Sequence, residues 1–146
     1  MKYFGSTLDF THQRNDDLMR VYHQILEEAR HIVKPNIFQK VADSPASRFW
    51  VSEERAAIVV SAIISGNEDW DLLQKHKSTF RMRKNKREMF LEIARRVKEM
   101  KEECPDKTIY ELTSTVVNQP APKFYLSART VGEFIYRIKN GFYEDK

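Results

Sequence analysis

Apolar residues recur every three or four positions over several stretches of the chain, which is the spacing of one helix face. The first such stretch predicts a long helix from about residue 15 to residue 33. Its apolar stripe consists of Leu18, Val21, Ile25, Ala29 and Ile32. We expect Asn15 to cap this helix and Pro35 to end it.

Two further helices follow in the first half of the chain. A short helix is predicted from Ile37 to Asp43, with Asn36 as its cap. Pro45 then blocks its continuation, and a loop rich in aromatic residues leads to Ser52, which is placed to cap a third helix. That helix should end near Gly66, because glycine suits the left-handed helix stop.

The same order of elements returns 75 positions later. The segment 41–52 reads VADSPASRFWVS, and the segment 116–127 reads VVNQPAPKFYLS. Gly66 is matched by Gly141, and upstream positions match at an offset of 72. This internal repeat predicts a second long helix over 85–103, a short helix from Ile109 capped by Thr108 or Asp106, and a third helix ending at Gly141.

The predicted fold class is therefore all-α, built from two tandem three-helix repeats of the form helix, short helix, aromatic loop, helix. The predicted organisation is an N-terminal arm (1–14), repeat 1 (15–66), a basic linker (67–85), repeat 2 (86–141) and a C-terminal tail (142–146). Strand content should be close to nil, apart from a short extended piece at 49–51 or 124–126. The sequence leaves open the oligomeric state and whether the repeats form one body or two lobes.

The aromatic loops offer large apolar anchors at Phe49, Trp50, Phe124 and Tyr125. In helical repeats such residues usually pack within the core or between elements. Two other roles remain open, namely stacking on the bases of a single strand and lining a groove for a protein partner.

The net charge of +4 is distributed unevenly. Residues 1–73 carry 8 basic and 11 acidic side chains, whereas residues 74–146 carry 17 basic and 10 acidic ones. The segment 75–87 is the most basic, since 7 of its 13 residues are Lys or Arg and none is acidic. Such asymmetry indicates a polyanionic partner, and a solvated loop between helices is the alternative.

The short helix, loop and third helix resemble a helix-turn-helix in outline, although the loop of about eight residues is longer than the usual turn. In the first copy Glu53 and Glu54 would repel phosphate groups, so we expect the second copy to bind nucleic acid, most readily DNA. The candidate nucleic-acid-binding residues are Lys75, Lys77, Arg81, Arg83, Lys84, Lys86, Arg87, Lys123, Arg129, Thr130, Tyr136, Arg137 and Lys139. The alternative function is a protein-interaction adaptor or scaffold that uses the aromatic loops.

Signals for catalysis are weak, and we expect a non-enzymatic protein without cofactor or metal. The chain has only 4 glycines and no Gly-rich phosphate loop, and its 4 histidines are scattered. The single cysteine, Cys104, cannot form an internal disulfide and suggests a reducing compartment. No apolar run approaches the roughly 18 residues of a membrane span, and no secretory signal precedes the first helix, so we expect a cytoplasmic protein without membrane contact.

Three segments resemble, in the same order, parts of a family of small uncharacterised bacterial proteins. They are 8–15 (LDFTHQRN), 44–56 (SPASRFWVSEERA) and 119–125 (QPAPKFY). The family is marked by a duplicated Pro-Ala-x-Arg/Lys-Phe-aromatic-Val/Leu-Ser motif and has no assigned activity. The resemblance implies kinship, a bacterial cytoplasmic setting and a link to mobile elements or phage; it implies no catalytic residue.

Overall fold

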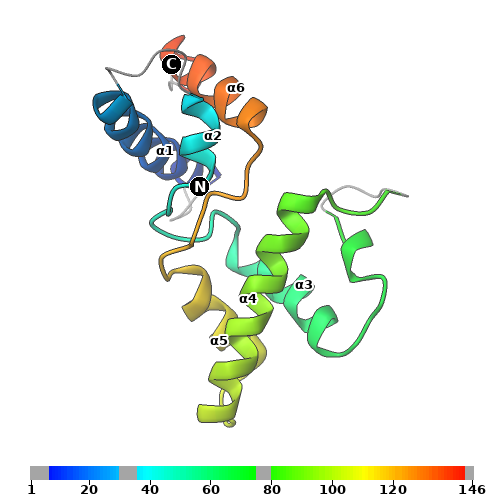
Figure 1. Ribbon diagram of the computed structural model, residues 1–146. Helices are drawn as coiled ribbons and strands as arrows, with labels where there is room; N and C mark the ends of the chain where they lie inside the picture. Colours follow the sequence, from blue (N-terminus) through cyan, green and yellow to red (C-terminus); the bar gives the residue numbers. More distant parts are fainter. Residues whose placement is uncertain (1–6, 30–35, 75–79, 144–146) are drawn as a thin grey trace, which may run out of the picture. The chain divides into compact units, whose positions relative to one another are not determined.

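The computed structural model describes residues 7–29, 36–74 and 80–143. Within these ranges the chain is all-α and contains no β-strand, as predicted. Its elements are α1 (Thr7–Ala29), α2 (Ile37–Ala42), α3 (Glu53–Ile64), a short 3-10 helix η1 (Trp70–Leu72), α4 (Lys84–Glu103), α5 (Ile109–Val117) and α6 (Ala128–Lys139) (Figure 1). No helix among the described residues is both long and apolar enough to span a bilayer.

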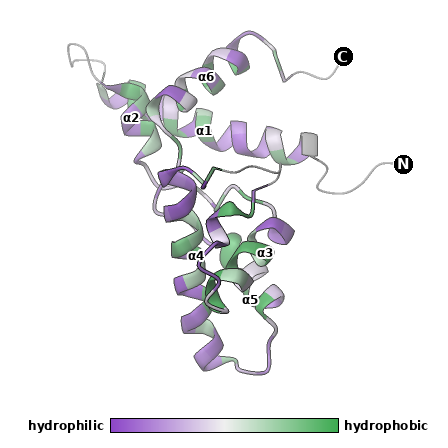
Figure 2. Ribbon diagram, turned by 90° about the vertical axis from the view of Figure 1, so that its right-hand side faces the viewer, coloured by the Kyte–Doolittle hydropathy of each residue, from purple (hydrophilic) through white to green (hydrophobic). Residues whose placement is uncertain are grey.

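The chain forms two compact units, and each has its own apolar core. Unit 1 comprises Met1–Ala46 and Pro122–Lys146, so that α2 packs against both α1 and α6. Unit 2 comprises Ser47–Ala121 and contains α3, α4 and α5 in mutual contact. The core of unit 1 includes Leu18, Val21, Val41, Val131 and Ile135, and that of unit 2 includes Val59, Phe90, Ile93, Val97 and Leu112. In Figure 2, α3 and α5 are largely apolar, whereas α4 is hydrophilic on its outward side.

The predicted helix caps are confirmed at both short helices and both third helices. Asn36 accepts a hydrogen bond from the amide of Gln39 at 3.3 Å, and Thr108 forms a complete capping box with Glu111. The hydroxyls of Ser52 and Ser127 each accept from the amide three residues later, at 3.1 Å.

Both predicted glycine stops are also confirmed. Gly66 and Gly141 have φ values of 84° and 71°, in the left-handed region that glycine adopts without strain. After each glycine the next amide closes the helix end by donating to a carbonyl five residues earlier: Asn67 donates to Ala62 at 3.0 Å, and Phe142 donates to Arg137 at 2.9 Å.

The first helix starts earlier than predicted. α1 begins at Thr7, so residues 7–14 of the predicted arm are helical, because this stretch holds neither Pro nor Gly to stop a helix. Asn15 is not a cap; it lies buried inside α1, where its Oδ1 accepts from Arg14 at 2.8 Å. The predicted stop at Pro35 and the contribution of Ile32 fall outside the described residues.

The third helices change partners relative to the predicted repeats. In each unit, the long and short helices of one predicted repeat pack with the third helix of the other: α1 and α2 with α6, and α4 and α5 with α3. The tandem arrangement of two self-contained repeats is therefore not confirmed. The helix-turn-helix outline is not confirmed either, because the two helices of each pair, α2 with α3 and α5 with α6, belong to different units.

Candidate functional site: a groove along α6

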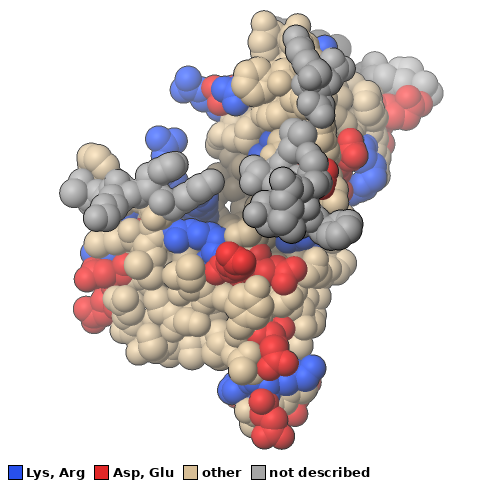
Figure 3. Space-filling model, turned by 180° about the vertical axis from the view of Figure 1, so that it is seen from behind, with Lys and Arg blue, Asp and Glu red and all other residues tan. Residues whose placement is uncertain are grey.

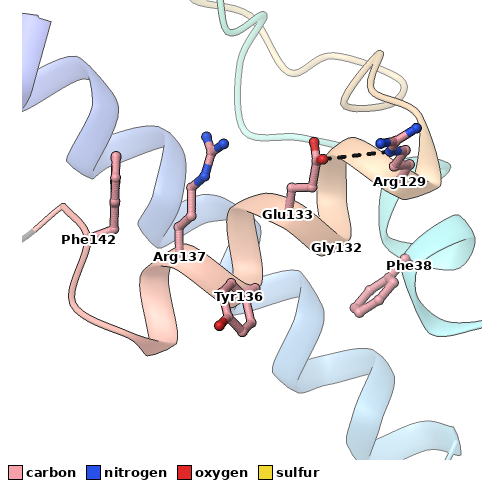
Figure 4. A pocket seen from close by; sticks show the side chains of 7 residues that line it. All are labelled: Phe38, Arg129, Gly132, Glu133, Tyr136, Arg137 and Phe142. Carbon is pink, nitrogen blue, oxygen red and sulfur yellow. Dashed lines mark ion pairs between the residues drawn. The ribbon is translucent and has the colours of Figure 1, made fainter.

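A groove of about 610 Å³ lies in unit 1 between α2, α6 and the turn that follows α6 (Figure 4). It is lined by Phe38, Arg129, Gly132, Glu133, Tyr136, Arg137 and Phe142. Five of these residues belong to α6, so the amphipathic character of that helix builds most of the site.

The helical repeat of α6 sets which side chains face the groove. Val131 and Ile135 are buried in the core of unit 1. Arg129, Glu133 and Tyr136 follow one another at intervals of four and three residues and therefore share the opposite, exposed side of the helix. In Figure 4, Arg129, Glu133 and Arg137 extend above the ribbon of α6, and Tyr136 extends below it.

Gly132 allows the side chain of Phe38 to lie directly against the backbone of α6. A Cβ atom at position 132 would meet the Cδ2 and Cε2 atoms of Phe38 at 2.9 Å, closer than real Cβ contacts. The ring of Phe38 also stacks on the buried ring of Tyr22, with 6.4 Å between centroids. The close approach at Gly132 thus fixes one wall of the groove.

The glycine stop of α6 places the third aromatic ring. Gly141 turns the chain so that Phe142 returns toward the last turn of the helix. The guanidinium carbon of Arg137 lies 5.3 Å from the centroid of the Phe142 ring, within cation–π range. A basic side chain and an exposed aromatic face therefore lie side by side at this end of the groove.

Charge and exposure make the groove suited to a ligand with flat rings and negative charge. The side chains of Tyr136 and Phe142 are 70% and 67% exposed, which is high for aromatic residues. Arg129 approaches Glu133 at 3.6 Å, a long and solvent-screened pair that leaves the guanidinium accessible. The two arginines and one glutamate give the groove a small positive balance.

The groove collects three of the predicted nucleic-acid-binding residues: Arg129, Tyr136 and Arg137. Other members of the predicted set lie elsewhere in unit 1. Thr130 serves the α6 cap through its amide and hydroxyl, and Lys139 donates to the hydroxyl of Tyr22 at 3.0 Å. Lys123 lies over the ring of Tyr125 at 5.4 Å.

The basic segment after residue 79 is partly neutralised within unit 2. Arg81 forms ion pairs with Asp69 at 3.0 Å and with the buried carboxylate of Asp71. Arg87 approaches the second oxygen of Asp71 at 3.3 Å. Hydrogen bonds to Asp69 and Asp71 raise the pKa of Arg81 above its ordinary value. Two of the predicted phosphate-binding arginines are thus engaged by carboxylates of the same unit.

The remaining basic residues of this segment fall into two groups. Arg83, Lys84 and Lys86 are exposed around the start of α4, whereas Lys75 and Lys77 fall outside the described residues.

Acidic and basic side chains are balanced within the described part of each unit. In unit 1 the described ranges hold as many Asp and Glu as Lys and Arg, and the same is true of unit 2. On the face drawn in Figure 3, red and blue side chains are interspersed. The net charge of +4 therefore comes from residues outside the described ranges. The described part of the second half keeps 14 basic and 8 acidic side chains, and each unit is balanced because it combines residues of both halves.

The aromatic loops serve packing. Phe49 and Phe124 are only 1% and 4% exposed, so the alternative that these two rings stack on bases is wrong. Tyr125 is buried too, in a left-handed conformation with φ 58°. Trp50 is half-buried, with the guanidinium of Arg48 5.1 Å from its ring centroid.

Sequence reasoning missed Phe38 and Phe142 as groove residues. Phe38 follows Ile37 in a six-residue helix too short to show which side is buried. Phe142 was assigned to a tail, although a large aromatic directly after a helix-ending glycine is the expected position for a contact back onto the helix.

Within the described ranges, no group of three or more His, Cys, Asp and Glu side chains is arranged to hold a metal ion. No protein-family model matches the chain, and neither the curated proteins nor the solved structures yield a match. The chemistry of the site itself, aromatic faces beside guanidinium groups, therefore has to carry the functional argument.

Proposed function

We propose that this chain is a non-enzymatic nucleic-acid-binding protein and that the groove along α6 is its interface. The observation that carries the proposal is the placement of Arg129, Tyr136 and Arg137 on the lining of one groove. Guanidinium groups bind phosphate oxygens through planar, paired hydrogen bonds, and an exposed aromatic ring offers a face to a base.

The spacing of the two arginines supports contact with a polymer. Arg129 and Arg137 are separated by eight residues of α6, which corresponds to about 12 Å along the helix axis. A single phosphate is too small to reach both guanidinium groups at that separation. A nucleic-acid backbone, with phosphates at regular intervals, can engage both at once.

The basic segment 81–87 of unit 2 contributes less to phosphate binding in this proposal. Because Arg81 and Arg87 pair with Asp69 and Asp71, a phosphate would have to compete with carboxylates already in place. Arg83 and Lys84 remain exposed and would add only a non-specific attraction.

A salt titration of nucleic-acid binding tests the proposal. The purified full chain is titrated with a fluorescein-labelled oligonucleotide, single-stranded and duplex, from about 50 to about 200 mM salt. The variant Arg129→Ala/Arg137→Ala should weaken binding and lower the slope of log K against log salt by about 1.4–1.8, because two phosphate contacts are lost. The matched control, Arg81→Ala/Arg87→Ala, removes the same charge and should change the slope less. Absence of binding to either oligonucleotide at the lowest salt would refute the proposal.

The adaptor function assigned to the aromatic loops has less support. Tyr125 is buried beneath Lys123, and Trp50 is half-buried beside Arg48, so neither loop presents a bare aromatic face. An adaptor would predict instead that a co-purified protein responds to changes at Trp50 and not to changes in the groove.

We also infer that the two sequence copies are structurally related and have exchanged their third helices. Two hydrogen bonds support this inference: Phe49 donates to Val117, and Phe124 donates to Ala42. Donors and acceptors alike are 75 positions apart, and each bond lies within one unit. The single, unpaired Cys104 is consistent with the bacterial cytoplasm as the setting.

A further inference from the structure

We propose that the α6 groove selects single-stranded nucleic acid, with unpaired bases stacking on the rings of Tyr136 and Phe142. This inference rests on the proposed function and narrows it to one class of polymer. It concerns rings outside the aromatic loops.

Three aromatic side chains stay accessible around the groove. Tyr136 and Phe142 are mostly exposed, and Phe38, whose ring stacks on that of Tyr22, is 39% exposed. A soluble protein gains free energy by burying such rings, so a cluster left open on one face marks a surface that meets another molecule. Flat rings without a fixed hydrogen-bond pattern are suited to bases of any sequence.

A cationic side chain lies beside these rings. Arg137 lies over the Phe142 ring at 5.3 Å, and the ring of Tyr143 packs against the same ring in a T-shaped arrangement, with 5.1 Å between centroids. Phe142 is still 67% exposed, so part of its ring remains accessible to a base. The guanidinium group of Arg137 can at the same time reach a phosphate on the same strand. Base stacking and phosphate contact would then occur within one nucleotide's reach, as in other single-strand sites.

Single strands and duplexes differ in whether the faces of their bases are open. In a duplex the bases are stacked on one another, so their faces are closed to Tyr136 and Phe142. Duplex binding would then depend on phosphate contacts alone, and the groove supplies only two arginines opposed by Glu133. The small net positive charge of the groove gives little affinity for a duplex. Stacking adds favourable binding free energy that only unpaired bases can provide.

The matching positions of unit 2 carry a different surface. At an offset of 75, Arg129, Tyr136 and Phe142 correspond to Glu54, Ser61 and Asn67. Unit 2 therefore offers neither the cations nor the rings at the equivalent places. This contrast assigns the binding to α6 and supplies a control surface within the same protein.

The test compares three probes of the same length and one set of variants. The probes are an oligothymidylate of about 12 nucleotides, the duplex that it forms with its complement, and an abasic strand with the same phosphates. Binding to the full chain is measured by fluorescence anisotropy. The variants are Tyr136→Ala and Phe142→Ala, which remove exposed rings, and the control is Tyr110→Ala, an exposed ring of unit 2.

The expected result is tighter binding of the oligothymidylate than of the duplex or the abasic strand. Each groove variant should weaken binding of the oligothymidylate by about five-fold or more. Tyr110→Ala should keep the affinity within about two-fold of the wild type. Circular dichroism verifies that each variant keeps its helices.

Two outcomes would overturn the inference, and they differ in what they say of the proposed function. The selection of single strands is refuted if the abasic strand and the duplex bind as tightly as the oligothymidylate. It is also refuted if the groove variants bind the oligothymidylate as tightly as the wild type does. In both cases nucleic-acid binding stands. If no probe binds, both proposals are refuted.

Discussion

The backbone amide of Phe49 donates a hydrogen bond to the carbonyl oxygen of Val117, 3.0 Å away, at the C-terminal end of α5. The amide of Phe124 makes the same bond to Ala42 at the end of α2, at 3.1 Å. Each bond satisfies a helix-end carbonyl that has no partner within its own helix. It also holds the following ring in place, because both phenylalanines are buried.

Truncation of these rings tests their contribution to the cores. Phe49→Ala and Phe124→Ala should each lower the free energy of unfolding by about 3–5 kcal/mol, because each removes a buried ring and leaves a cavity. Urea denaturation followed by circular dichroism measures the change. Ile58→Ala, at a side chain that is 56% exposed on α3, is the control and should change stability by at most about 0.5 kcal/mol. A loss below about 1 kcal/mol at Phe49 would contradict the burial of this ring.

A second prediction concerns Gly66, which ends α3 in the left-handed conformation. Gly66 has φ 84°, and a Cβ atom built there meets nothing within 4 Å, so the cost of a side chain is purely conformational. Gly66→Ala should destabilise unit 2 by about 1–2 kcal/mol. Gly66→Asn should lose less stability, because asparagine adopts the left-handed backbone region more readily than alanine does. Equal losses for the two variants would refute the conformational explanation.

The local features of the fold were predictable because they depend on neighbours in sequence. The cap at Ser52, the stop at Gly66 and the apolar stripe of α1 each follow from residues within a few positions of one another. The start of α1 was placed wrongly because Asn15 is a strong cap residue in isolation. In the folded unit it is buried, and Arg14 supplies a local partner for its side-chain oxygen.

The partners of the third helices could not be predicted from the sequence. α3 and α6 present apolar residues at matching positions, Val60 with Ile135 and Ile63 with Ile138. Either helix therefore offers a similar face to either pair of long and short helices, and periodicity cannot separate the two pairings. The ion pairs of Arg81 were equally hidden, because they depend on how η1 returns toward the start of α4.

The carboxylate of Asp71 provides a third prediction. It is buried and pairs with Arg81 and Arg87, so Asp71→Asn leaves both guanidinium groups without their shared counter-charge. We expect a loss of about 1–3 kcal/mol in the free energy of unfolding. Asp69→Asn is the matched control; its pair with Arg81 is exposed and should contribute at most about 1 kcal/mol.

The same variant also tests which surface binds nucleic acid. Because Asp71→Asn removes a negative charge beside Arg81 and Arg87, it should tighten oligonucleotide binding strongly only if the 81–87 segment is the interface. With the α6 groove as the interface, affinity should change by less than about three-fold. Strong tightening would therefore transfer the proposed site to unit 2.

The capping box of α5 predicts a pH dependence. Hydrogen bonds from the amide and hydroxyl of Thr108 lower the pKa of Glu111 below its ordinary value. The charged carboxylate therefore stabilises the fold fully above its unfolded pKa of about 4.3, and this stabilisation is lost as the pH falls through the lower folded value. The stability difference between wild type and Glu111→Gln should shrink accordingly on acidification. A difference that stays constant from neutral pH into this acidic range would contradict the role of the charge.

The contact between Gly132 and Phe38 gives a prediction that links stability to the groove. Alanine favours a helix interior over glycine by about 1 kcal/mol, but at position 132 its Cβ would lie 2.9 Å from the ring of Phe38. In the wild-type background, Gly132→Ala should therefore raise the free energy of unfolding by less than this amount, because the new Cβ displaces the ring of Phe38. In the Phe38→Ala background the obstacle is gone, so Gly132→Ala should recover the full gain of about 1 kcal/mol. A double-mutant cycle measures the coupling, and a coupling near zero would show that the glycine does not position this wall of the groove.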